Sequence, residues 1–315
     1  MNFHQLEIFS AVVERRSFTD AAFDLRLTQP AVSLQVKALE RKLGLPLFER
    51  SDGKLRLTQA GEALYRCAIS ILHSKDEAER AISELAAATK GKLILGANTT
   101  GGMYLLPRIV RVFIEAQPGA EIIFQIESTE WLYQQILESA VDMALVGGPT
   151  EDRRFGVEPV CVDQVVLIVS PSHPFARASK ITLDELKGQP LILPAHGSRT
   201  RQLVERKLKE SGAHPRVAMQ LSGSEAVKKA VEANLGVAFV SQFAVERECS
   251  LGALKIIPVE RFGLTRHMEL VYRKQKYFSP VARRFQEFIH LYARDHLVPP
   301  NKTRFKPSPE IKNRL

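Results

Sequence analysis

The sequence predicts an α/β protein in three successive parts: an N-terminal winged helix-turn-helix, a long linker helix and a C-terminal α/β region. Three observations carry this prediction. Short amphipathic helices separated by a tight turn precede Gly44, an apolar residue recurs every seven positions between Thr58 and Ala88, and strands alternate with helices from Gly91 onward. A chain of 315 residues is long enough for two or three domains.

Three short helices are expected before Gly44. The first carries apolar residues at helical spacing, namely Phe3, Leu6, Phe9, Val12 and Val13. Ser17 is the expected N-cap of the second helix, with Asp20 in its first turn. Thr28 caps the third helix, Pro30 is tolerated in its first turn, and Gly44 ends it. The tight turn between the second and third helices matches a helix-turn-helix.

A β-hairpin and a long helix are expected next. Residues 47–50 and 54–57 predict the two strands of a wing around a turn at 51–53. The long helix has an apolar seam at Leu64, Ile71, Ala78 and Leu85, and a second seam at Ala68 and Ile82 that Lys75 interrupts. This repeat is typical of a two-stranded coiled coil, although a helix packed on its own domain is the alternative. Because no neighbouring helical segment is expected to cover it, we interpret the helix as a dimerising connector.

The remaining chain predicts an α/β sheet of short, buried, parallel strands. Strands are expected at 92–95, 121–126, 143–146, 165–170, 191–193, 217–221 and 237–240. Helices are expected at about 99–113, 128–137, 200–211 and 224–233. The strands at 164–170 and 266–272 could cross between two lobes, and residues 299–315 are expected to form a basic, disordered tail.

The formal charge of +9 is concentrated at the C-terminus. Residues 1–60 hold 9 basic and 7 acidic side chains, net +2, whereas residues 273–315 hold 11 and 3, net +8. The total charge therefore does not argue that the N-terminal module binds DNA. No secretory signal or membrane-spanning run is visible, and Cys67, Cys161 and Cys249 lie far apart, so we expect a cytoplasmic protein without disulfides or a thiolate metal site.

The order of motifs in residues 1 to about 292 resembles the LysR-type transcriptional regulators. The matching residues are Phe9, Ser17-Phe18-Thr19, Ala21-Ala22, Leu27-Thr28-Gln29-Pro30-Ala31-Val32-Ser33, Gln35, Leu39-Glu40, Leu43-Gly44, Leu47-Phe48-Glu49-Arg50 and Leu57-Thr58-Gln59-Ala60-Gly61. The resemblance implies a two-lobed effector domain similar to periplasmic solute-binding proteins, and assembly as a homodimer or homotetramer. The expected domains are a DNA-binding module at 1–58, a linker helix at 59–90, an effector domain at 91–295 and a tail at 296–315. Lobe I would take about 91–163 and 267–295, and lobe II about 164–266.

The third helix is the expected recognition helix, whose exposed side chains would read operator DNA. Gln29, Ser33 and Lys37 are spaced by four residues and share a face. Gln29 can bond adenine bidentately, Ser33 can meet a base or a phosphate, and Pro30 would pack against a sugar or a thymine methyl group. Lys37 would contact phosphate, as would Arg50 and Lys54 from the wing. The alternative for Gln29 and Ser33 is capping and solvation, and that for Arg50 and Lys54 is a solvated hairpin. The family often carries a long basic side chain where this chain has Leu34.

A small anionic effector is expected between the lobes. Hydroxyl groups and glycines at strand-to-helix turns present backbone N–H groups and a helix dipole, which suit anions. The candidates are Thr99, Thr100, Gly101, Ser128, Thr129, Gly147, Gly148, Ser198, Arg199 and Thr200. Each hydroxyl could instead be only an N-cap. Arg199 and Arg201 suggest a carboxylate, phosphate or sulfate ligand.

An enzyme and a solute-binding protein are the rival interpretations of the two-lobed fold. The sequence contains no P-loop, G-x-S-x-G or H-E-x-x-H motif, and its 8 histidines are scattered without ligand spacing. His196 near the cleft is expected to be a polar lining residue rather than a base. A solute-binding protein would not need residues 1–88. We therefore expect a DNA-binding regulator with no catalytic residues, no metal and no cofactor.

Overall fold

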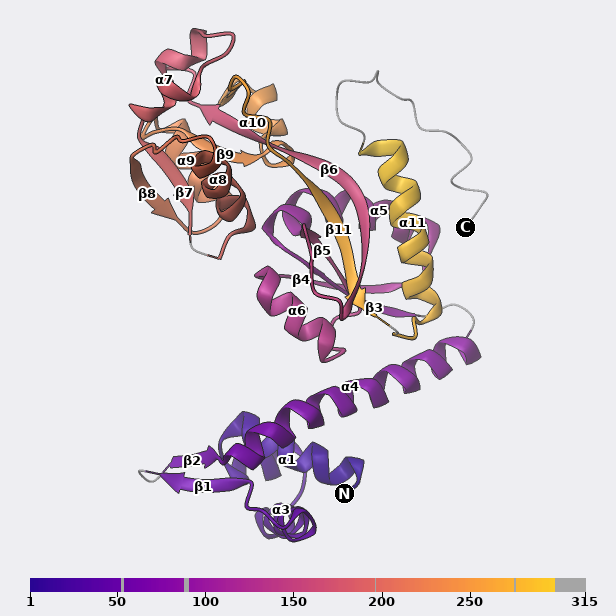
Figure 1. Ribbon diagram of the computed structural model, residues 1–315. Helices are drawn as coiled ribbons and strands as arrows, with labels where there is room; N and C mark the ends of the chain where they lie inside the picture. Colours follow the sequence, from indigo (N-terminus) through magenta and orange to yellow (C-terminus); the bar gives the residue numbers. More distant parts are fainter. Residues whose placement is uncertain (52–53, 88–90, 196, 275, 298–315) are drawn as a thin grey trace. The chain divides into compact units, whose positions relative to one another are not determined.

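A computed structural model describes residues 1–51, 54–87, 91–195, 197–274 and 276–297 (Figure 1). The chain forms two compact units. The first comprises Met1–Ala86 with Leu137–Ala140, and the second comprises Ala87–Ile136 with Val141–Leu315. Residues 298–315 of the expected tail and the position of His196 lie outside the described residues, as does the tip of the wing at 52–53. The expected start of the tail at 296 is wrong, because His296 ends a helix and Leu297 is buried.

The first unit is a winged helix-turn-helix followed by a long helix. Its elements are α1 (Phe3–Arg15), α2 (Phe18–Asp24), α3 (Gln29–Leu43), β1 (Phe48–Ser51), β2 (Lys54–Leu57) and α4 (Gln59–Ala87). The expected caps are confirmed, since the Ser17 hydroxyl accepts from the Asp20 N–H and the Thr28 hydroxyl from the Ala31 N–H. Gly44 ends α3 at φ +74°, a left-handed conformation that favours glycine.

The first half of α4 packs on its own module, so the expectation that no helix covers it is wrong. Ala68 is fully buried with Leu6 and Phe9 of α1 and Leu39 of α3, and Leu64 and Leu72 pack against the same cluster. Lys75, which interrupts the apolar seam, instead pairs with Glu7 of α1 at 3.0 Å. Further along α4, Ile82 keeps 68% of its surface exposed. Apolar side chains that could meet a second helix therefore remain at Ile82 and at Ile71, which keeps 37% of its surface exposed.

The second unit contains two lobes. Lobe I is built on strands β3 (Lys92–Ala97), β4 (Glu121–Ile126) and β5 (Met143–Gly147), with helices α6 (Thr129–Leu137), α11 (Pro280–His296) and a π-helical turn η1 (Gly101–Leu105) that leads into α5 (Leu106–Ala116). Parallel pairing places β3 between β4 and β5. The core of lobe I joins Phe113 of α5 to Phe285 and Phe288 of α11, a helix that was not among the expected ones.

Lobe II contains the intervening part of the chain. Its elements are η2 (Pro174–Arg177), α7 (Leu183–Lys187), β7 (Leu191–Pro194), α8 (Arg199–Glu210), β8 (Val217–Leu221), α9 (Ser224–Glu232), β9 (Ala238–Ser241), η3 (Gln242–Ala244), α10 (Glu246–Ser250) and β10 (Lys255–Ile257). Apolar clusters cover both faces of its sheet, one with Val204 and Leu208 of α8 and the other with Val227 and Val231 of α9.

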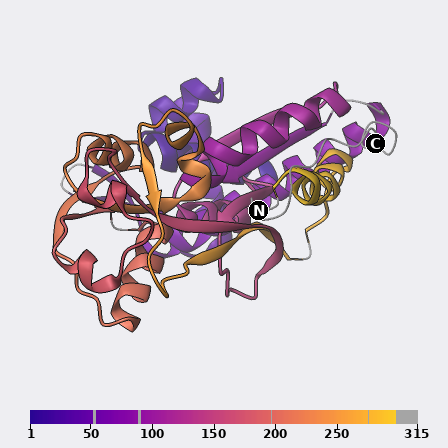
Figure 2. The same cartoon turned by 90° about the horizontal axis from the view of Figure 1, so that it is seen from above.

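Two long strands connect the lobes: β6 (Phe155–Val169) and β11 (Thr265–Arg273) run side by side and antiparallel from one lobe to the other (Figure 1, Figure 2). In β6, Cys161 belongs to the core of lobe I and Val165 to that of lobe II. The expectation of short parallel strands is wrong for this pair, since β6 is long and its partners β9, β10 and β11 are all antiparallel to it. The overall α/β class and the expected crossing are confirmed.

The described helices include none with the length and apolar character required to cross a bilayer.

Candidate functional site

The candidate recognition face of the N-terminal module is the exposed side of α3. Val32, Val36 and Leu39 form a buried stripe along one side of α3. Gln29 and Lys37 lie on the other side of the helix and are therefore exposed to solvent. Pro30 is also exposed, and Ser33 is half-buried. These four predicted residues therefore share an accessible surface, as a helix entering a major groove requires.

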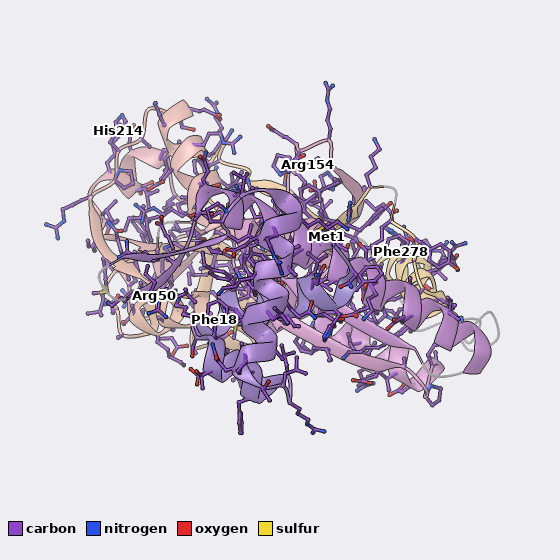
Figure 3. All side chains as sticks on the ribbon, turned by 90° about the horizontal axis from the view of Figure 1, so that it is seen from below. Met1, Phe18, Arg50, Arg154, His214 and Phe278 are labelled. Atoms are coloured by element: carbon purple, nitrogen blue, oxygen red, sulfur yellow. The ribbon has the colours of Figure 1, made fainter. Side chains whose placement is uncertain are left out.

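The two predicted wing residues project from adjacent strands. Strand β1 pairs with β2 in antiparallel register, with Arg50 opposite Leu55 and Ser51 opposite Lys54. Both Arg50 and Lys54 are exposed, so each cation can reach a phosphate. Figure 3 shows the side chains of the chain, with Arg50 labelled on the wing and Phe18 on α2. Phe18 packs against Phe48 at the base of the wing, with 5.5 Å between the ring centroids.

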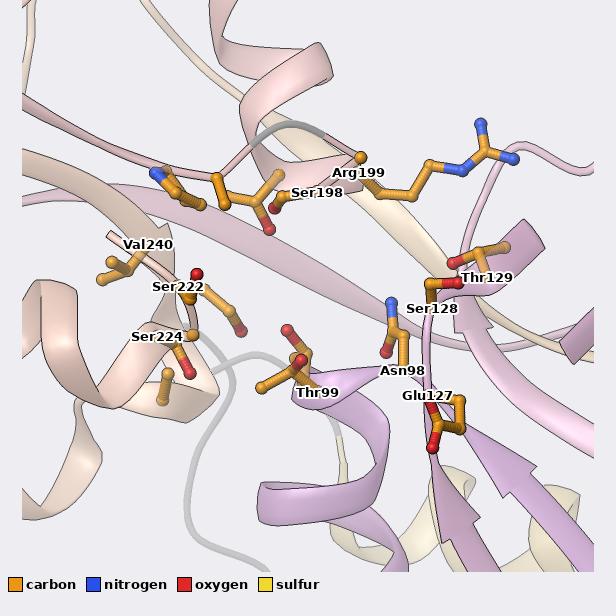
Figure 4. A pocket seen from close by; sticks show the side chains of 18 of the residues that line it. Asn98, Thr99, Glu127, Ser128, Thr129, Ser198, Arg199, Ser222, Ser224 and Val240 are labelled. Atoms are coloured by element: carbon orange, nitrogen blue, oxygen red, sulfur yellow. The ribbon is translucent and has the colours of Figure 1, made fainter. Parts of the chain in front are cut away.

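A cavity of about 270 Å³ lies between the two lobes of the second unit. Residues of lobe I line one side and residues of lobe II the other (Figure 4). The polar lining residues are Asn98, Thr99, Thr100, Glu127, Ser128, Thr129, Ser198, Arg199, Thr200, Ser222, Ser224 and Ser241. The space suits a small polar molecule.

Helix starts from both lobes meet at this cavity. Ser128 precedes α6 and Ser198 precedes α8, and each hydroxyl accepts from a first-turn N–H, of Trp131 and Arg201 respectively. Gly223, which also lines the cavity, precedes α9 and offers no side-chain cap to the first turn. Because unpaired first-turn N–H groups and the helix dipole favour negative charge, the convergence of these starts makes the cavity suited to an anion.

A buried arginine links residues on the two sides of the cavity. Arg266 of β11 donates from Nη2 to the Thr100 hydroxyl of lobe I at 3.2 Å and from Nη1 to the Thr200 hydroxyl of lobe II at 3.1 Å. Its Nε donates to the carboxylate of Asp163 at 2.9 Å, and the Ser241 hydroxyl donates to the other oxygen at 2.7 Å. Burial raises the pKa of the Asp163 carboxyl, an effect that the nearby Arg266 opposes.

This network makes two threonine hydroxyl oxygens acceptors toward Arg266. The oxygens of Thr100 and Thr200 each accept a hydrogen bond from Arg266, so each O–H remains available to donate. Since both residues also line the cavity, they can donate to a bound acceptor while Arg266 holds them in place. Because Asp163 balances the positive charge of the Arg266 guanidinium, Arg266 acts on the cavity by orienting Thr100 and Thr200 and not as an unpaired charge.

The structure brings seven of the ten predicted effector residues together: Thr99, Thr100, Ser128, Thr129, Ser198, Arg199 and Thr200. The three predicted glycines are absent from the lining residues of this cavity. Gly101 donates its N–H to Asn98, Gly147 lies so close to Arg266 that a Cβ would stand 2.9 Å from Nη1, and Gly148 lies against the Glu269 carboxylate. Close packing accounts for these glycines better than ligand contact does.

The two arginines at the start of α8 differ in their surroundings. Arg201 is buried and donates to Glu205, to the Pro194 carbonyl and to Gln220, so it supports lobe II and does not line the cavity. The Arg199 side chain extends toward the side of the cavity that carries Ser128 and Thr129 (Figure 4). Its Nε is buried and has no hydrogen-bond partner among the described residues.

Several cavity residues were not among the predicted ones. Ser222, Gly223 and Ser224 follow β8 and precede α9, which is the same strand-to-helix pattern that marked Ser128 and Ser198. That pattern could have found them. Arg266, which holds two of the lining hydroxyl groups, lies in a strand that also contains His267 and Glu269, so its charge gave no distinctive signal. Asn98 and Glu127 carried none either.

A second polar cluster also connects the lobes beside the cavity. The Tyr104 hydroxyl of lobe I lies 3.0 Å from the Ser224 hydroxyl and donates to Glu225 of α9 at 2.5 Å. Lys228, which is buried, pairs with Glu225 and with Glu248 at 2.7 Å each. Burial alone would lower the pKa of Lys228, but its bonds to these carboxylates outweigh that effect and raise it. The cluster stabilises the arrangement in which the lobes meet.

Among the described residues, no group of three or more His, Cys, Asp or Glu side chains is placed to hold a metal ion. The cysteines are all unpaired, and burial raises the pKa of the Cys161 thiol to about 12.

A helix-turn-helix with an exposed recognition face, together with a two-lobed domain around a polar cavity, defines a ligand-responsive DNA-binding regulator. Residues 3–62 match the bacterial regulatory helix-turn-helix family of lysR type, and residues 86–293 match the LysR substrate binding domain. The chain therefore belongs to the LysR family of transcriptional regulators.

Two of the three similar proteins described next match nearly the whole chain. The chain is 35% identical over 295 residues to the transcriptional activator CmpR of Synechocystis sp., which covers 94% of this chain and 96% of that protein. Full-length OxyR of Pseudomonas aeruginosa shares the fold with a TM-score of 0.71 and 24% identity, covering 98% of this chain and 99% of OxyR. The regulatory domain of Synechocystis CcmR in complex with 2-PG has a TM-score of 0.62 and 25% identity, covering 66% of this chain and 99% of that domain.

Proposed function

We propose that this regulator changes its action on DNA when a small anion binds between the lobes of its second unit. Gln29 contacts an adenine edge from α3, Ser33 contacts a base or a phosphate, and Pro30 packs against a sugar or a thymine methyl group. Lys37, Arg50 and Lys54 contact phosphates. The observation that carries the effector proposal is the meeting of hydroxyl groups and helix starts from both lobes at one cavity of about 270 Å³.

The geometry favours an anion that carries several acceptor oxygens. Thr100 and Thr200 have O–H groups available to donate because Arg266 occupies their oxygens. Arg199 adds a charged group at the rim, with a buried Nε that lacks a partner among the described residues. Glu127, also at the cavity, would repel a second anionic group but could accept from a ligand hydroxyl. The binding of 2-PG by the similar CcmR regulatory domain supports an anionic effector of this size.

The anion would act by favouring the arrangement in which the lobes meet around it. A ligand shifts a conformational equilibrium only as far as it binds one arrangement better than the other. An anion held simultaneously by Ser128 of lobe I and Thr200 of lobe II satisfies that condition, because its contacts are complete only when both lobes are present. The resulting shift would alter how the DNA-binding modules of an oligomer are spaced.

We also propose where the protein works, how it assembles and what role the anion has. The protein works in the cytoplasm as a homodimer or homotetramer that binds a pseudo-palindromic operator, with the later part of α4 in contact with a partner. The bound anion is a signal rather than a substrate. Incubation of 2-PG with the full-length protein should return it chemically unchanged by mass spectrometry, and its consumption would contradict this part of the proposal.

The test is calorimetric titration of the full-length protein with 2-PG and with inorganic phosphate, paired with thermal unfolding. A ligand at about 100 times its Kd stabilises the folded state by ~2.7 kcal/mol, which is readily measured. Thr200→Val and Ser128→Ala should each weaken binding about tenfold, since each removes one hydrogen bond to a charged ligand. Thr265→Val, at an exposed position of β11, is the matched control and should bind normally. Equal binding by all four proteins would refute the cavity as the anion site.

A further inference from the structure

We propose that Leu34 reads a thymine in each operator half-site, through contact between its side chain and the thymine C5-methyl group. The inference rests on the proposed entry of α3 into the major groove and adds a specificity-determining residue to that surface. The proposal names the chemical group that Leu34 recognises on the DNA, the thymine C5-methyl.

The geometry places Leu34 at the middle of the exposed side of α3. Leu34 follows Pro30 by four residues and precedes Lys37 by three, so the three side chains lie along one face of the helix. The buried stripe of Val32 and Val36 lies on another face. Leu34 keeps 60% of its surface exposed, although this module has an apolar core that other leucines join. It therefore contributes little to the folded module alone.

The chemistry of the major groove narrows what Leu34 can recognise. A leucine side chain has no donor or acceptor, so it cannot distinguish guanine, adenine or cytosine by hydrogen bonding. The thymine C5-methyl is the apolar group that a base pair presents in this groove. Pro30, one turn before Leu34, extends the apolar surface toward the start of the helix. A methyl group seated against these two side chains would be removed from water.

The position of Leu34 distinguishes this role from that of an ordinary exposed leucine. Single exposed apolar residues are common on protein surfaces and usually have no binding role. Leu45, with 56% of its surface exposed, is such a residue, and it lies beyond the C-terminal end of α3. Leu34 instead lies between residues whose polar and charged groups face the same side. The comparison supplies a control of the same chemistry and similar exposure.

The experiment begins with selection of binding sites from a random duplex library by the full-length wild-type protein. In the preferred site, each thymine is then replaced singly by deoxyuridine, which removes only the C5-methyl group. Affinities are measured for wild type, Leu34→Ala and Leu45→Ala at one salt concentration. Burial of a methyl group is worth about a fourfold change in affinity. We expect one thymine in each half-site at which deoxyuridine weakens wild type and Leu45→Ala about fourfold. The same replacement should weaken Leu34→Ala by a clearly smaller factor, because Pro30 alone then covers the methyl group.

Leu34→Arg extends the test, because arginine recognises the O6 and N7 of guanine. Selection with this variant should replace that thymine by guanine and leave the rest of the half-site unchanged. Its failure to change the preferred base would overturn the assignment, even if the variant binds the original site weakly.

Three further outcomes would overturn the proposal. Methyl dependence could persist unchanged in Leu34→Ala, or no thymine of the site could show it, and in either case Leu34 does not read a methyl group. Leu34→Ala could also weaken binding to thymine and deoxyuridine duplexes by the same factor, which would indicate a role in folding or assembly. The underlying assignment of α3 is tested separately: if Gln29→Ala with Ser33→Ala binds the selected site as tightly as wild type, α3 is not the recognition helix and both proposals fail.

Discussion

Removing the charge of Arg266 should destabilise the second unit strongly, and removing Asp163 as well should restore much of the loss. Arg266 and Asp163 are both buried, with 2.9 Å between Nη2 and the carboxylate. In Arg266→Met the Asp163 carboxylate keeps only the Ser241 hydroxyl of its described side-chain partners. Breaking a buried ion pair on one side costs about 3–5 kcal/mol, because an uncompensated charge remains buried.

The second variant removes that uncompensated charge. In Asp163→Asn with Arg266→Met, the amide oxygen can still accept from Ser241, and no ionised group remains at the site. We therefore expect the double variant to be at least about 2 kcal/mol more stable than Arg266→Met alone. The sign of the coupling is the informative quantity, since independent residues would give additive losses.

Urea unfolding followed by tryptophan fluorescence measures both effects directly. The sequence contains one tryptophan, Trp131, and it lies in α6 of lobe I, so the signal reports on the second unit. A loss below about 1 kcal/mol in Arg266→Met would refute the claim that this ion pair is buried and coupled. Additive losses in the double variant would refute it equally.

Three other predictions concern separate features of the second unit. Tyr104→Phe removes the contact with Glu225 between the lobes and should weaken 2-PG binding about threefold or more, whereas exposed Tyr277→Phe should not; equal titrations would contradict this. Burial lowers the pKa of His173, whose Nδ1 accepts from the Phe175 N–H, so protonation favours the unfolded chain. Stability should therefore fall as the pH drops below about 6.5, and the melting temperature of His173→Asn should fall less; parallel curves would count against it. Cys161, with its pKa raised to about 12, should resist iodoacetamide in the native protein while exposed Cys67 reacts, as peptide mass spectrometry can establish.

Elements with local chemical signals were predictable from the sequence. The caps of α2 and α3 depend on single hydroxyl groups, Ser17 and Thr28, whose N–H partners lie three residues further along. The same is true of Ser128 and Ser198, so the hydroxyl groups on both sides of the cavity were found. These contacts are made within one turn of chain, and no knowledge of distant residues is needed.

The parts that were missed depend on partners far along the chain. The first half of β6 contains Pro159, which has no N–H and argues against a central strand. In the structure, the β6–β11 register shifts next to Pro159, between the positions that oppose Met268 and Glu269, and the ladder continues beyond it. Arg266 was missed for a related reason, since its partners Thr100, Asp163 and Thr200 come from three separate segments. Likewise, the burial of Ala68 in α4 becomes evident only once α1 and α3 are folded beneath that helix.

The path of the chain through the two lobes has a consequence for how the protein is made. Lobe II is inserted within lobe I, because the chain leaves along β6 and returns along β11. The core of lobe I includes Phe285 and Phe288, which are among the last residues of that lobe to be synthesised. A nascent chain ending before α11 therefore holds every part of lobe II but an incomplete lobe I. Translation thus favours a sequence of events in which the inner lobe becomes stable first and the outer lobe closes around its ends afterwards.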